Sequence, residues 1–375
     1  MKEPDTGVKL STKQPDNRKN TSNGKQAHVN KSHDRFDSYP DSDLQDYLLE
    51  GVSRTFALTI PELPDGLDET VSNAYLLCRI VDTIEDEPQL TPSEKRKYCN
   101  QFCGVVQGRE SAELFSRNLS ASLSHNTSPA EHELIELTER VIRITHNFPE
   151  PHKKALERCV RIMSEGMISF QENASPDGLK NMDELNKYCY HVAGVVGEML
   201  TELFCLHSKE ISKNKSKLMD LSVSFGQGLQ MTNILKDLWE DHERSACWLP
   251  QTVFKQHGFE LKDLRNKVST PGFQEGLIYL IGITNMHLEN ALKYTLLIPA
   301  EEKGIRRFCL WAIGMAVLTI RKIYKNIDFT EGEDVKITRN SVKTTILLSN
   351  LTVKNDFLIR SFFDMARSGI PYYKP

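Results

Sequence analysis

The sequence predicts an all-α fold organised as a single large domain, and three observations predict it. Apolar residues recur at spacings of three and four from Leu44 onward, which is the periodicity of a helix that buries one face. Strand-like alternation of apolar and polar residues is nearly absent. The chain has 375 residues, of which 39% are hydrophobic, and this is enough for a sizeable buried core.

The first forty residues differ from the rest of the chain. They are rich in Lys, Asn, Asp, Ser and Gln and contain almost no large apolar side chains. Such a segment buries too little surface to offset its ordering entropy, so we expect a disordered polar tail over residues 1–40. The tail carries acidic residues and lacks the apolar run of a signal peptide, which argues against a targeting segment. The folded domain is predicted over residues 41–375.

Helices are predicted wherever the periodicity persists between helix-breaking residues. Capping residues such as Ser93 and Asp183 mark helix starts, and prolines such as Pro149 and Pro299 mark breaks. After a first helix from Asp41, the predicted segments are 65–87, 93–107, 130–147, 151–172, 182–206, 212–242, 273–297, 304–326 and 340–367. Residues 108–129 and 250–272 are predicted to be irregular connections.

The composition excludes several classes of function. A net charge of -4 offers no basic footprint for nucleic acid, so no DNA or RNA partner is expected. Eight scattered cysteines lack the paired spacings of a zinc site and are interpreted as reduced, which favours the cytoplasm. The longest apolar run, 308–320, is shorter than the roughly 20 residues that cross a bilayer, so we expect a core helix there.

A cluster of carboxylates ends the helix predicted over 65–87. Asp82, Glu85 and Asp86 stand at positions i, i+3 and i+4, which places three carboxylates on one face within a turn. Oxygen-rich clusters suit Mg²⁺, which takes one or two carboxylates together with substrate phosphate oxygens. For this cluster alone, however, a solvated acidic helix face is the better explanation.

The same spacing recurs on a second predicted helix, in Asp237, Glu240 and Asp241. Gln230 and Asn233 precede this cluster in an otherwise apolar run and continue the polar stripe toward it. A solvated face would not need that stripe. Two clusters that face each other in a helical bundle can form a cage for Mg²⁺ and diphosphates. The duplication therefore favours a metal site over two solvated faces.

Several short motifs occur in order along the chain. They are Ser53-Arg54-Thr55-Phe56, Arg79 three residues before the first cluster, Tyr188-Cys189-Tyr190-His191-Val192-Ala193-Gly194-Val195-Val196-Gly197, Gln230-Met231-Thr232-Asn233-Ile234, and Phe308-Cys309. Over residues 41 to 345 the sequence thereby resembles the squalene and phytoene synthase family. The resemblance implies a single-domain isoprenoid synthase bundle with both carboxylate clusters at the mouth of a central active-site cavity.

The resemblance also implies roles for individual residues. The residues implied in diphosphate binding are Ser53, Arg54, Arg79, Gln230 and Asn233. Tyr188 would act as general acid or base, and the ring faces of Phe56 and Phe308 would stabilise carbocations. Each has a structural alternative, because an arginine is often a surface ion pair, and a tyrosine or phenylalanine at helical spacing is usually core.

The activity implied is prenyl transfer by a squalene synthase of sterol or hopanoid biosynthesis. Two farnesyl diphosphates would condense head to head with Mg²⁺ to presqualene diphosphate, and NADPH would then reduce the rearranging intermediate to squalene. No Gly-rich dinucleotide fingerprint is present. Val335-Lys336-Ile337-Thr338-Arg339 instead resembles a segment that contacts NADPH, with Thr338 in place of a basic residue. Lys336, Arg339 and Asn233 are the cofactor candidates, although the two basic residues are equally explained as surface charges.

Three alternatives remain open. A relative without the reductive step would make dehydrosqualene or phytoene, and a non-catalytic relative would act as an assembly factor. The Val-Lys-Ile segment favours squalene, and the intact carboxylate clusters favour an enzyme. The segment 241–248 is shorter than its counterpart in the family and lacks its glycines, so loop closure and the role of Arg244 stay unassigned.

The last predicted segment is apolar on one side. Phe357, Leu358, Phe362, Phe363 and Met365 stand among charged residues, which is typical of a helix that lies on a membrane surface, although a core-capping helix is equally consistent. The chain ends without an apolar span, so the resemblance implies a bacterial-type enzyme without a membrane anchor. We expect a cytoplasmic monomer with peripheral membrane contact for product release.

Overall fold

The computed structural model describes residues 36, 39–53, 55–172, 175–266 and 270–373. Contacts divide the chain into residues 1–38 and 39–375, and the account below concerns the second unit. Of the predicted tail, residues 1–40, only residues 36, 39 and 40 are described. Arg54 also lies outside the described residues.

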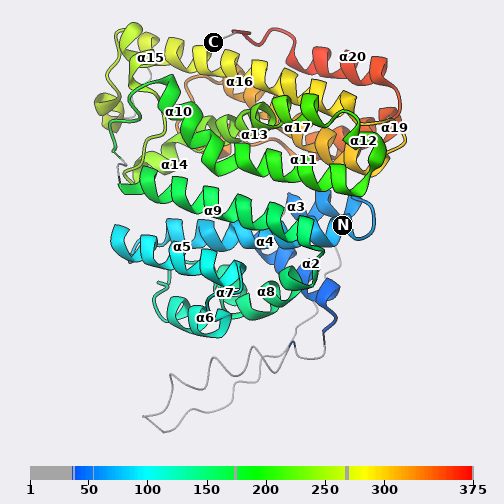
Figure 1. Cartoon of the computed structure of the whole chain (residues 1–375). Helices are drawn as coiled ribbons and strands as arrows, with labels where there is room; N and C mark the ends of the chain where they lie inside the picture. Colours follow the sequence, from blue (N-terminus) through cyan, green and yellow to red (C-terminus); the bar gives the residue numbers. More distant parts are fainter. Residues whose placement is uncertain (1–35, 37–38, 54, 173–174, 267–269, 374–375) are drawn as a thin grey trace, which may run out of the picture. The chain divides into compact units, whose positions relative to one another are not determined.

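The described chain is helical, and Figure 1 shows the course of its helices. The first half consists of α2 (Asp41–Val52), α3 (Phe56–Thr59), the 3₁₀ turn Ile60–Glu62, α4 (Leu67–Asp86), α5 (Pro92–Val106), α6 (Ala112–Ser120), α7 (Pro129–Glu136), α8 (Thr138–Asn147) and α9 (Glu150–Glu172). The second half consists of α10 (Met182–Cys189), the π turn Tyr190–Gly194, α11 (Val195–His207), α12 (Lys209–Ser212), α13 (Lys215–Lys236), α14 (Leu238–Glu243), α15 (Gln251–Gln256), the 3₁₀ turn Leu261–Asn266, α16 (Pro271–Leu297), α17 (Lys303–Lys325), α18 (Gly332–Val335), α19 (Arg339–Thr352) and α20 (Asp356–Arg367).

The long helices pack in successive layers. Helix α9 contacts α4 and α5 on one side and α11 on the other, α11 in turn contacts α13, and α13 packs against α16 and α17. The same sequence of layers can be followed from α5 up to α16 in Figure 1. Within the described residues the only extended pairing is an isolated bridge between Leu179 and Pro250. The predicted all-α fold is confirmed.

Several helix boundaries follow from local capping. Helix α5 begins with a capping box, in which Thr91 and Glu94 satisfy each other's backbone N–H groups, and Pro92 occupies the first turn, where it loses no hydrogen bond. Helix α7 begins in the same way with Ser128 and Glu131. Glu131 therefore has a structural reason to stand where it does, and its carboxylate also reaches the active-site region described below.

Two predicted connections contain helices that periodicity did not reveal. Helix α6 lies within 108–129, where Ser111 accepts a hydrogen bond from the Leu114 N–H at 3.2 Å and Phe115 and Leu119 are fully buried. Two apolar positions are too few to establish a period in a Ser-rich stretch. Helix α15 and a 3₁₀ turn likewise lie within 250–272. The predictions of irregular structure for these stretches were wrong.

Four predicted helices are divided. The segment 182–206 forms α10 and α11 with the π turn between them. The segment 130–147 forms α7 and α8, which meet at Leu137, and 340–367 forms α19 and α20. The segment 212–242 divides at Asp237 into α13 and α14. Backbone hydrogen bonds still cross that division, from the Asp237 N–H to the Asn233 carbonyl at 2.8 Å and from the Asp241 N–H to the Asp237 carbonyl at 2.9 Å. The second carboxylate cluster thus sits at a change of helix.

The stretch Met182–His207 is long and apolar enough to cross a membrane by length and composition alone. Our expectation of no span considered only uninterrupted apolar runs and missed it. It contacts α9 and α13, as a core helix does. A Cβ atom on Gly197 would lie 2.2 Å from the Ser222 carbonyl oxygen, and one on Gly226 would lie 2.2 Å from that of Ala193. These glycines let the backbones of α11 and α13 approach closely.

Candidate active site

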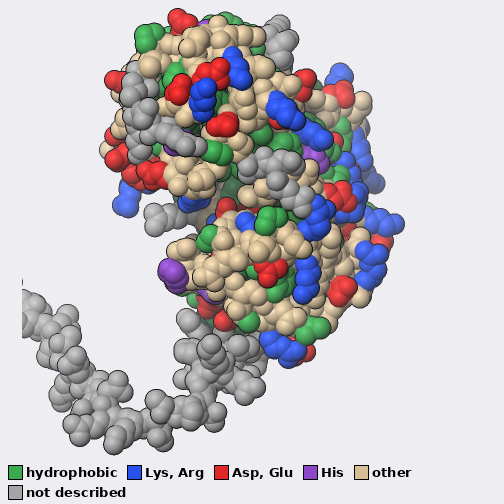
Figure 2. Space-filling view, turned by 90° about the vertical axis from the view of Figure 1, so that its left-hand side faces the viewer, with side chains coloured by type: hydrophobic (Ala, Val, Ile, Leu, Met, Phe, Trp, Pro, Cys, Tyr) green, Lys and Arg blue, Asp and Glu red, His purple; other side chains and the backbone are tan. Residues whose placement is uncertain are grey.

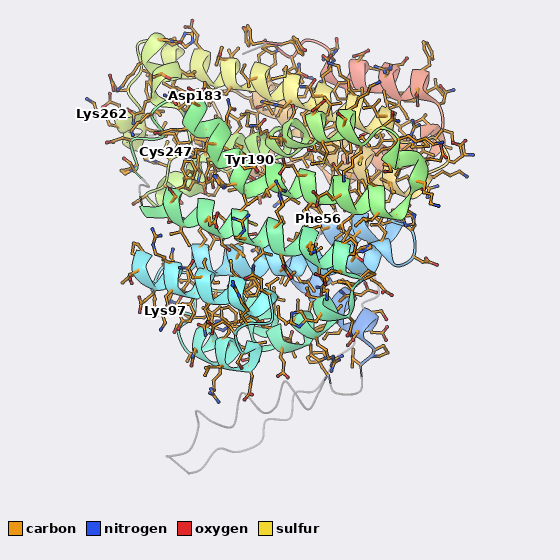
Figure 3. The ribbon with its side chains drawn as sticks, in the orientation of Figure 1. Phe56, Lys97, Asp183, Tyr190, Cys247 and Lys262 are labelled. Carbon is orange, nitrogen blue, oxygen red and sulfur yellow. The ribbon has the colours of Figure 1, made fainter. Side chains whose placement is uncertain are left out.

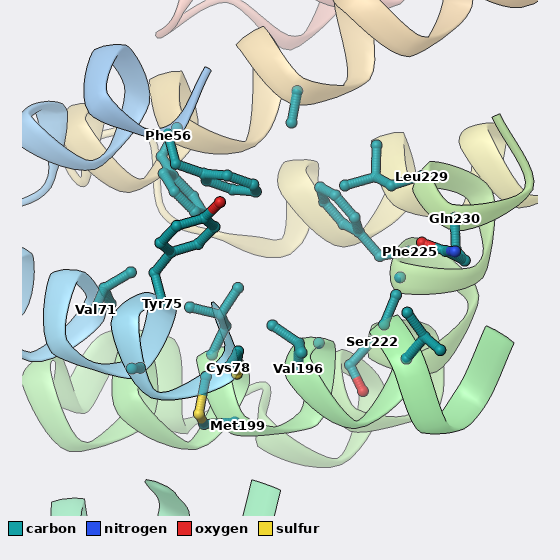
Figure 4. Close-up of a pocket in the computed structure, with 18 of the residues that line it drawn as sticks. Phe56, Val71, Tyr75, Cys78, Val196, Met199, Ser222, Phe225, Leu229 and Gln230 are labelled. Carbon is teal, nitrogen blue, oxygen red and sulfur yellow. The ribbon is translucent and has the colours of Figure 1, made fainter. Parts of the chain in front are cut away.

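A cavity of about 280 Å³ lies among α3, α4, α11, α13 and α17. Its walls are mainly apolar and aromatic side chains, and Figure 4 shows Phe56 and Tyr75 on one side with Phe225 and Leu229 on the other. The volume is near the lower end of the range for ligand pockets in proteins. The cavity is therefore suited to hydrocarbon rather than to a polar metabolite.

Aromatic rings shape this cavity. The rings of Phe56 and Tyr75 are 4.8 Å apart between centroids, and Phe308 packs edge-on against Phe204 at 6.3 Å. Phe56 and Phe308, both predicted from the sequence, line the cavity. Figure 3 labels Phe56, at the start of α3, within the helical framework. Tyr75 was missed, although it lies one turn before Arg79 on the same helix.

Three of the polar residues predicted for the site also line the cavity. Asp82 comes from α4, and Gln230 and Asn233 come from α13. Ser53 lies just before α3, where its hydroxyl accepts a hydrogen bond from the Phe56 N–H at 3.1 Å. The apolar chamber therefore has a carboxylate and two amides from facing helices in its wall.

The three carboxylates of the first cluster do not all point in the same direction. Glu85 accepts a hydrogen bond from the Gln171 amide of α9 at 2.7 Å and is 9% exposed. Burial raises the pKa of Glu85 to about 8, with Asp86 adding to the increase. Residues advance by about 100° around a helix, so Glu85 points well away from Asp86. Glu85 faces α9, whereas Asp82 lines the cavity.

Asp82 and Asp86 are costly to ionise in the folded protein. Desolvation raises the pKa of Asp82 to about 7, against the opposing effect of Arg79, and it also raises the pKa of Asp86, although the Asp86 side chain is exposed on the surface. Arg79 forms an ion pair with Glu131 and lies 3.7 Å from Asp82. Its Nε is buried and has no hydrogen-bond partner within the described structure. The sequence analysis did not single out Glu131, because a glutamate at this position is explained by the capping box with Ser128.

The second cluster divides in a similar way. Burial raises the pKa of Asp237, and it raises the pKa of Asp241 to about 6 with a further contribution from Asp237. Asp237 also lies 3.1 Å from Lys236. Glu240, predicted as a metal ligand, instead accepts a hydrogen bond from the Gly332 N–H at 3.0 Å. Asp237, at the N-cap of α14, and Asp241, within α14, therefore remain as a pair of carboxylates.

The two clusters are near enough to influence each other. The charge of Asp86 contributes to the raised pKa of Asp241, and Arg244 lowers the pKa of both carboxyls against the effect of burial. Arg244, unassigned from sequence, is therefore a cation close to both clusters. Figure 2 shows that the side of the molecule on which α14 lies is hollowed midway, with acidic and basic side chains around the hollow.

The donor set fits Mg²⁺ with a diphosphate better than a metal held by protein alone. Among the residues that the structure describes, no three His, Cys, Asp or Glu side chains converge closely enough to hold an ion. Mg²⁺ usually keeps several waters and takes one or two carboxylates plus phosphate oxygens. Asp82 and Asp86 on one side, and Asp237 and Asp241 on the other, match that requirement.

Tyr188 is stacked rather than free in the cavity. Its ring lies 4.1 Å from that of Trp248 with an interplanar angle of 7°, and Phe170 packs edge-on at 5.3 Å. Tyr188 is 5% exposed and is not among the described residues that line the cavity. Burial raises its pKa well above the usual value, and Glu85, Asp241 and Asp86 add to the increase. Its hydroxyl is protonated at neutral pH and lies near the carboxylates.

The predicted cofactor segment lies away from the cavity lining. Lys336 is exposed and pairs with Glu333, and its carbonyl accepts a hydrogen bond from Lys322 Nζ at 2.6 Å. Arg339 is exposed at the first position of α19. Of the three cofactor candidates, Asn233 lines the cavity, whereas the two basic residues do not.

Known proteins resemble this chain over most of its length. Squalene synthase ERG9 of Gibberella zeae is 29% identical over 311 residues, which cover 82% of this chain and 64% of that protein. Squalene synthase of Schizosaccharomyces pombe is 28% identical over 329 residues, which cover 86% of this chain and 68% of that protein. The chain thus spans about two thirds of the length of these relatives.

Solved structures agree in fold. A structure of TcSQS with the ligand BPH1237 aligns with a TM-score of 0.70 at 20% identity and covers 89% of this chain and 93% of that one. A dehydrosqualene synthase in complex with a ligand aligns with a TM-score of 0.61 at 16% identity, covering 89% and 99%. The predicted isoprenoid synthase bundle is confirmed. The family model for squalene/phytoene synthase matches residues 49–341, and the chain therefore belongs to the squalene/phytoene synthase family.

Proposed function

We propose that this protein condenses two farnesyl diphosphates head to head to presqualene diphosphate and then reduces that intermediate to squalene with NADPH. One observation carries the proposal, namely an apolar cavity whose wall includes Asp82, with a second aspartate pair near enough for Asp86 to raise the pKa of Asp241. Ionisation of an allylic diphosphate needs cationic charge on the leaving group and a dry chamber for the hydrocarbon. The squalene synthases among the relatives support the same activity.

Each group of residues has a part in this chemistry. Asp82, Asp86, Asp237 and Asp241 would hold Mg²⁺, which, when bound, supplies positive charge to the diphosphate oxygens. Arg79 and Arg244 add fixed positive charge beside the same carboxylates. Because the Tyr188 hydroxyl keeps its proton, it acts as a hydrogen-bond donor to the diphosphate rather than as a base.

The cavity wall would protect the carbocation. Phe56, Tyr75, Phe225 and Phe308 line the chamber and present their rings to it. Aromatic faces attract cations without providing a nucleophile, so the cation would survive until the second prenyl double bond attacks it. Water exclusion by these rings is what separates coupling from simple hydrolysis.

Reduction is the finer part of the proposal. It rests on Asn233 in the cavity wall and on the exposed basic residues Lys336 and Arg339, of which Lys336 would exchange its ion pair with Glu333 for a cofactor phosphate. The dehydrosqualene synthase among the structural neighbours supports the alternative that the reaction stops before reduction.

Product analysis tests this function. Purified protein is incubated with farnesyl diphosphate and Mg²⁺, with and without NADPH, and a parallel reaction contains geranylgeranyl diphosphate. Squalene formed only with NADPH is the expected result. Dehydrosqualene in both farnesyl reactions would remove the reductive step, phytoene would change the substrate, and no diphosphate release from either substrate would leave a non-catalytic assembly role.

A double variant tests the site. Asp82→Asn with Asp237→Asn removes one carboxylate from each side of the mouth, and we expect diphosphate release to disappear while the circular dichroism spectrum stays that of the native protein. Full turnover by this variant would contradict the assignment of the metal site.

We also propose that the face formed by α19 and α20 contacts a membrane surface. Residues 339–367 contain five basic and two acidic residues, a net charge of +3 in a chain of net charge -4. Large apolar side chains on these helices are exposed in the described structure, at Leu347, Leu351, Phe357, Leu358 and Met365. A second cavity of about 510 Å³ opens between α17, α19 and α20. Basic charge beside exposed apolar groups suits an anionic bilayer.

Vesicle sedimentation tests this contact. The full chain is mixed with neutral phosphatidylcholine vesicles or with vesicles that also contain phosphatidylserine, alongside a Leu351→Asp and Phe357→Asp double variant. We expect binding that favours the anionic vesicles and is lost in the double variant, whereas Leu114→Asp, which changes an exposed leucine on α6, binds as wild type. Equal sedimentation of all three proteins would reject the α19–α20 face.

A further inference from the structure

Glu240 is the residue of the second carboxylate cluster whose contacts differ most from its prediction. Its Oε1 accepts a hydrogen bond from the Gly332 N–H at 3.0 Å. Its Oε2 is buried and has no hydrogen-bond partner within the described residues. Two roles therefore compete for Glu240. It either holds the backbone at Gly332 or binds a metal ion through Oε2, and the neighbouring contacts bear on the choice.

The residue before Glu240 contacts the same segment. The indole N–H of Trp239 donates a hydrogen bond to the Phe329 carbonyl at 2.8 Å, and both side chains are buried. Trp239 and Glu240 therefore hold two points of one stretch of backbone, residues 329–336, which we call the strap. Two neighbouring bonds fix the position of a segment better than either does alone.

The other side of the strap is anchored on α17. Lys322 Nζ of α17 donates a hydrogen bond to the Lys336 carbonyl at 2.6 Å, and the side chain of Val335 is fully buried. The strap thus lies between α14 and α17 and ends at Lys336. That residue and Arg339, three positions later, are the basic candidates for the cofactor.

Helix α14 consequently presents different residues to the carboxylate site and to the strap. Asp241 follows Glu240 directly, yet the advance of about 100° per residue turns their side chains to different faces. Asp237 and Asp241 share one face and Trp239 and Glu240 point elsewhere. A shift of α14 that accompanies diphosphate binding would therefore be transmitted to the strap through the Glu240 and Trp239 bonds.

From this geometry we infer that Glu240 is a positioning residue: it couples the Asp237–Asp241 side of the site to the strap and so sets the position of Lys336 for the reductive step. The inference deepens the proposed function and rests on it for the identity of the cofactor. It also assigns Glu240 a role separate from metal binding, and this part can be tested without any cofactor.

Gly332 offers an independent way to break the same contact. A Cβ atom at Gly332 would lie 2.5 Å from Glu240 Oε1, closer than any real contact of that kind. Gly332→Ala must therefore break this contact, because either the strap or the end of the Glu240 side chain has to move. Glu331→Gln is the matched control, because it changes an exposed glutamate next to Gly332 without touching this bond.

The first measurement separates coupling from metal binding. Diphosphate release from farnesyl diphosphate is followed without NADPH in Glu240→Gln, Glu240→Ala and Gly332→Ala. We expect rates within about threefold of wild type, because the ligands Asp237 and Asp241 are retained. A fall of about 100-fold in Glu240→Gln, where the amide oxygen can still accept the Gly332 bond, would show that the carboxylate binds metal and would overturn the inference.

The second measurement follows the strap itself. Amide hydrogen exchange in the substrate-free protein should be faster at residues 332–338 in Glu240→Ala and Gly332→Ala, and unchanged in Glu240→Gln and Glu331→Gln. Unchanged exchange at these residues in both disruptive variants would reject the coupling.

The third measurement concerns reduction. The KM for NADPH should rise about tenfold in Glu240→Ala and Gly332→Ala, with diphosphate release unaffected and with recovery in Glu240→Gln. An unchanged KM in the disruptive variants would separate the strap from the cofactor. If wild type makes no reduced hydrocarbon, the proposed reductive step itself fails, and the release and exchange measurements still decide whether Glu240 holds the strap or a metal.

Discussion

The mouth of the cavity and the core between α13, α16 and α17 are built on opposite principles. The mouth, by which we mean Asp82 in the cavity wall together with Asp86, Asp237 and Asp241, gathers carboxylates whose pKa values are raised by desolvation. The core is apolar, and His287 within it is kept neutral, with a pKa that burial lowers to about 4. Residues at the mouth thus serve binding at a cost in stability, whereas residues of the core supply that stability.

The effect of pH on this stability cost at the mouth has a definite sign. A carboxyl whose folded pKa lies above its unfolded value binds more protons in the folded state, so the stability it contributes falls as pH rises through that interval. For Asp82 the interval runs from about 4 to about 7. Bound cations would offset this cost, which is why the charges can be retained. Four measurements test whether the two regions differ in this way.

The largest expected effect is loss of activity without loss of fold. Asp241→Asn removes a proposed ligand while keeping the shape of the side chain, and diphosphate release should fall by about 10³-fold, equivalent to about 4 kcal/mol. Its thermal midpoint should not decrease. Asp220→Asn on the exposed side of α13 is the control and should keep full activity. A variant of Asp241 that unfolds would place this residue with the core instead.

The reverse pattern is expected at the start of α16, where Phe273 belongs to the same apolar cluster as the core. Phe273 is 1% exposed and packs against Phe254 and Phe259, with ring centroids 5.5 and 5.1 Å away. Phe273→Ala should lower the free energy of unfolding by about 3–4 kcal/mol, measured by urea denaturation, because it leaves a cavity among these rings. Leu206→Ala, on the exposed surface of α11, should change it little. A small loss at Phe273 would contradict a rigid core.

Acid should weaken the core through His287. Its folded pKa of about 4 lies below the unfolded value of about 6.5, so its contribution to stability is lost as pH falls from 6.5 toward 4. Between pH 7.5 and pH 5 the loss should be about 2 kcal/mol. His287→Gln should remove that part of the pH dependence. Parallel pH profiles for wild type and His287→Gln would reject the assignment.

The smallest effect is a gain in stability at the mouth. Asp82→Asn should raise the free energy of unfolding by about 1 kcal/mol at pH 8, and by less at pH 5, where the native carboxyl is already protonated. Differential scanning calorimetry at the two pH values measures both. Asp328→Asn, an exposed site after α17, serves as control. Destabilisation of Asp82→Asn at both pH values would mean that Arg79 stabilises this carboxylate more than burial disfavours it.

The fold was predictable because its long helices carry long periodic patterns. Helices α4, α9, α16 and α17 begin and end within a few residues of the predicted bounds, since each carries apolar residues over many turns. Helix α6 was missed because its buried stripe is only Phe115 and Leu119. Short helices owe their existence to capping and tertiary contacts, which a period cannot reveal.

The sequence predicted which helices carry the site, but it did not predict which carboxylates bond to other elements. Spacing in the sequence placed Glu85 and Glu240 with the aspartates, yet each bonds to another element, Gln171 in one case and Gly332 in the other. Their partners lie 86 and 92 residues away in the chain, so no local pattern could indicate them. Only packing brings Arg244 beside Asp86. Tyr75 was missed for another reason, because its helical spacing from Asp82 also fits an ordinary core residue.

Helix α17 forms a wall between two chambers. Phe308 and Ala312 face the central cavity, whereas Ile313 and Val317 face the cavity beneath α19 and α20. A one-residue insertion or deletion in this helix would rotate every side chain beyond it by about 100° and turn the lining residues there away from their chamber. Substitutions along α17 should therefore be tolerated more readily than changes in its length before Val317. Any homologue that keeps both chambers should align here without a gap.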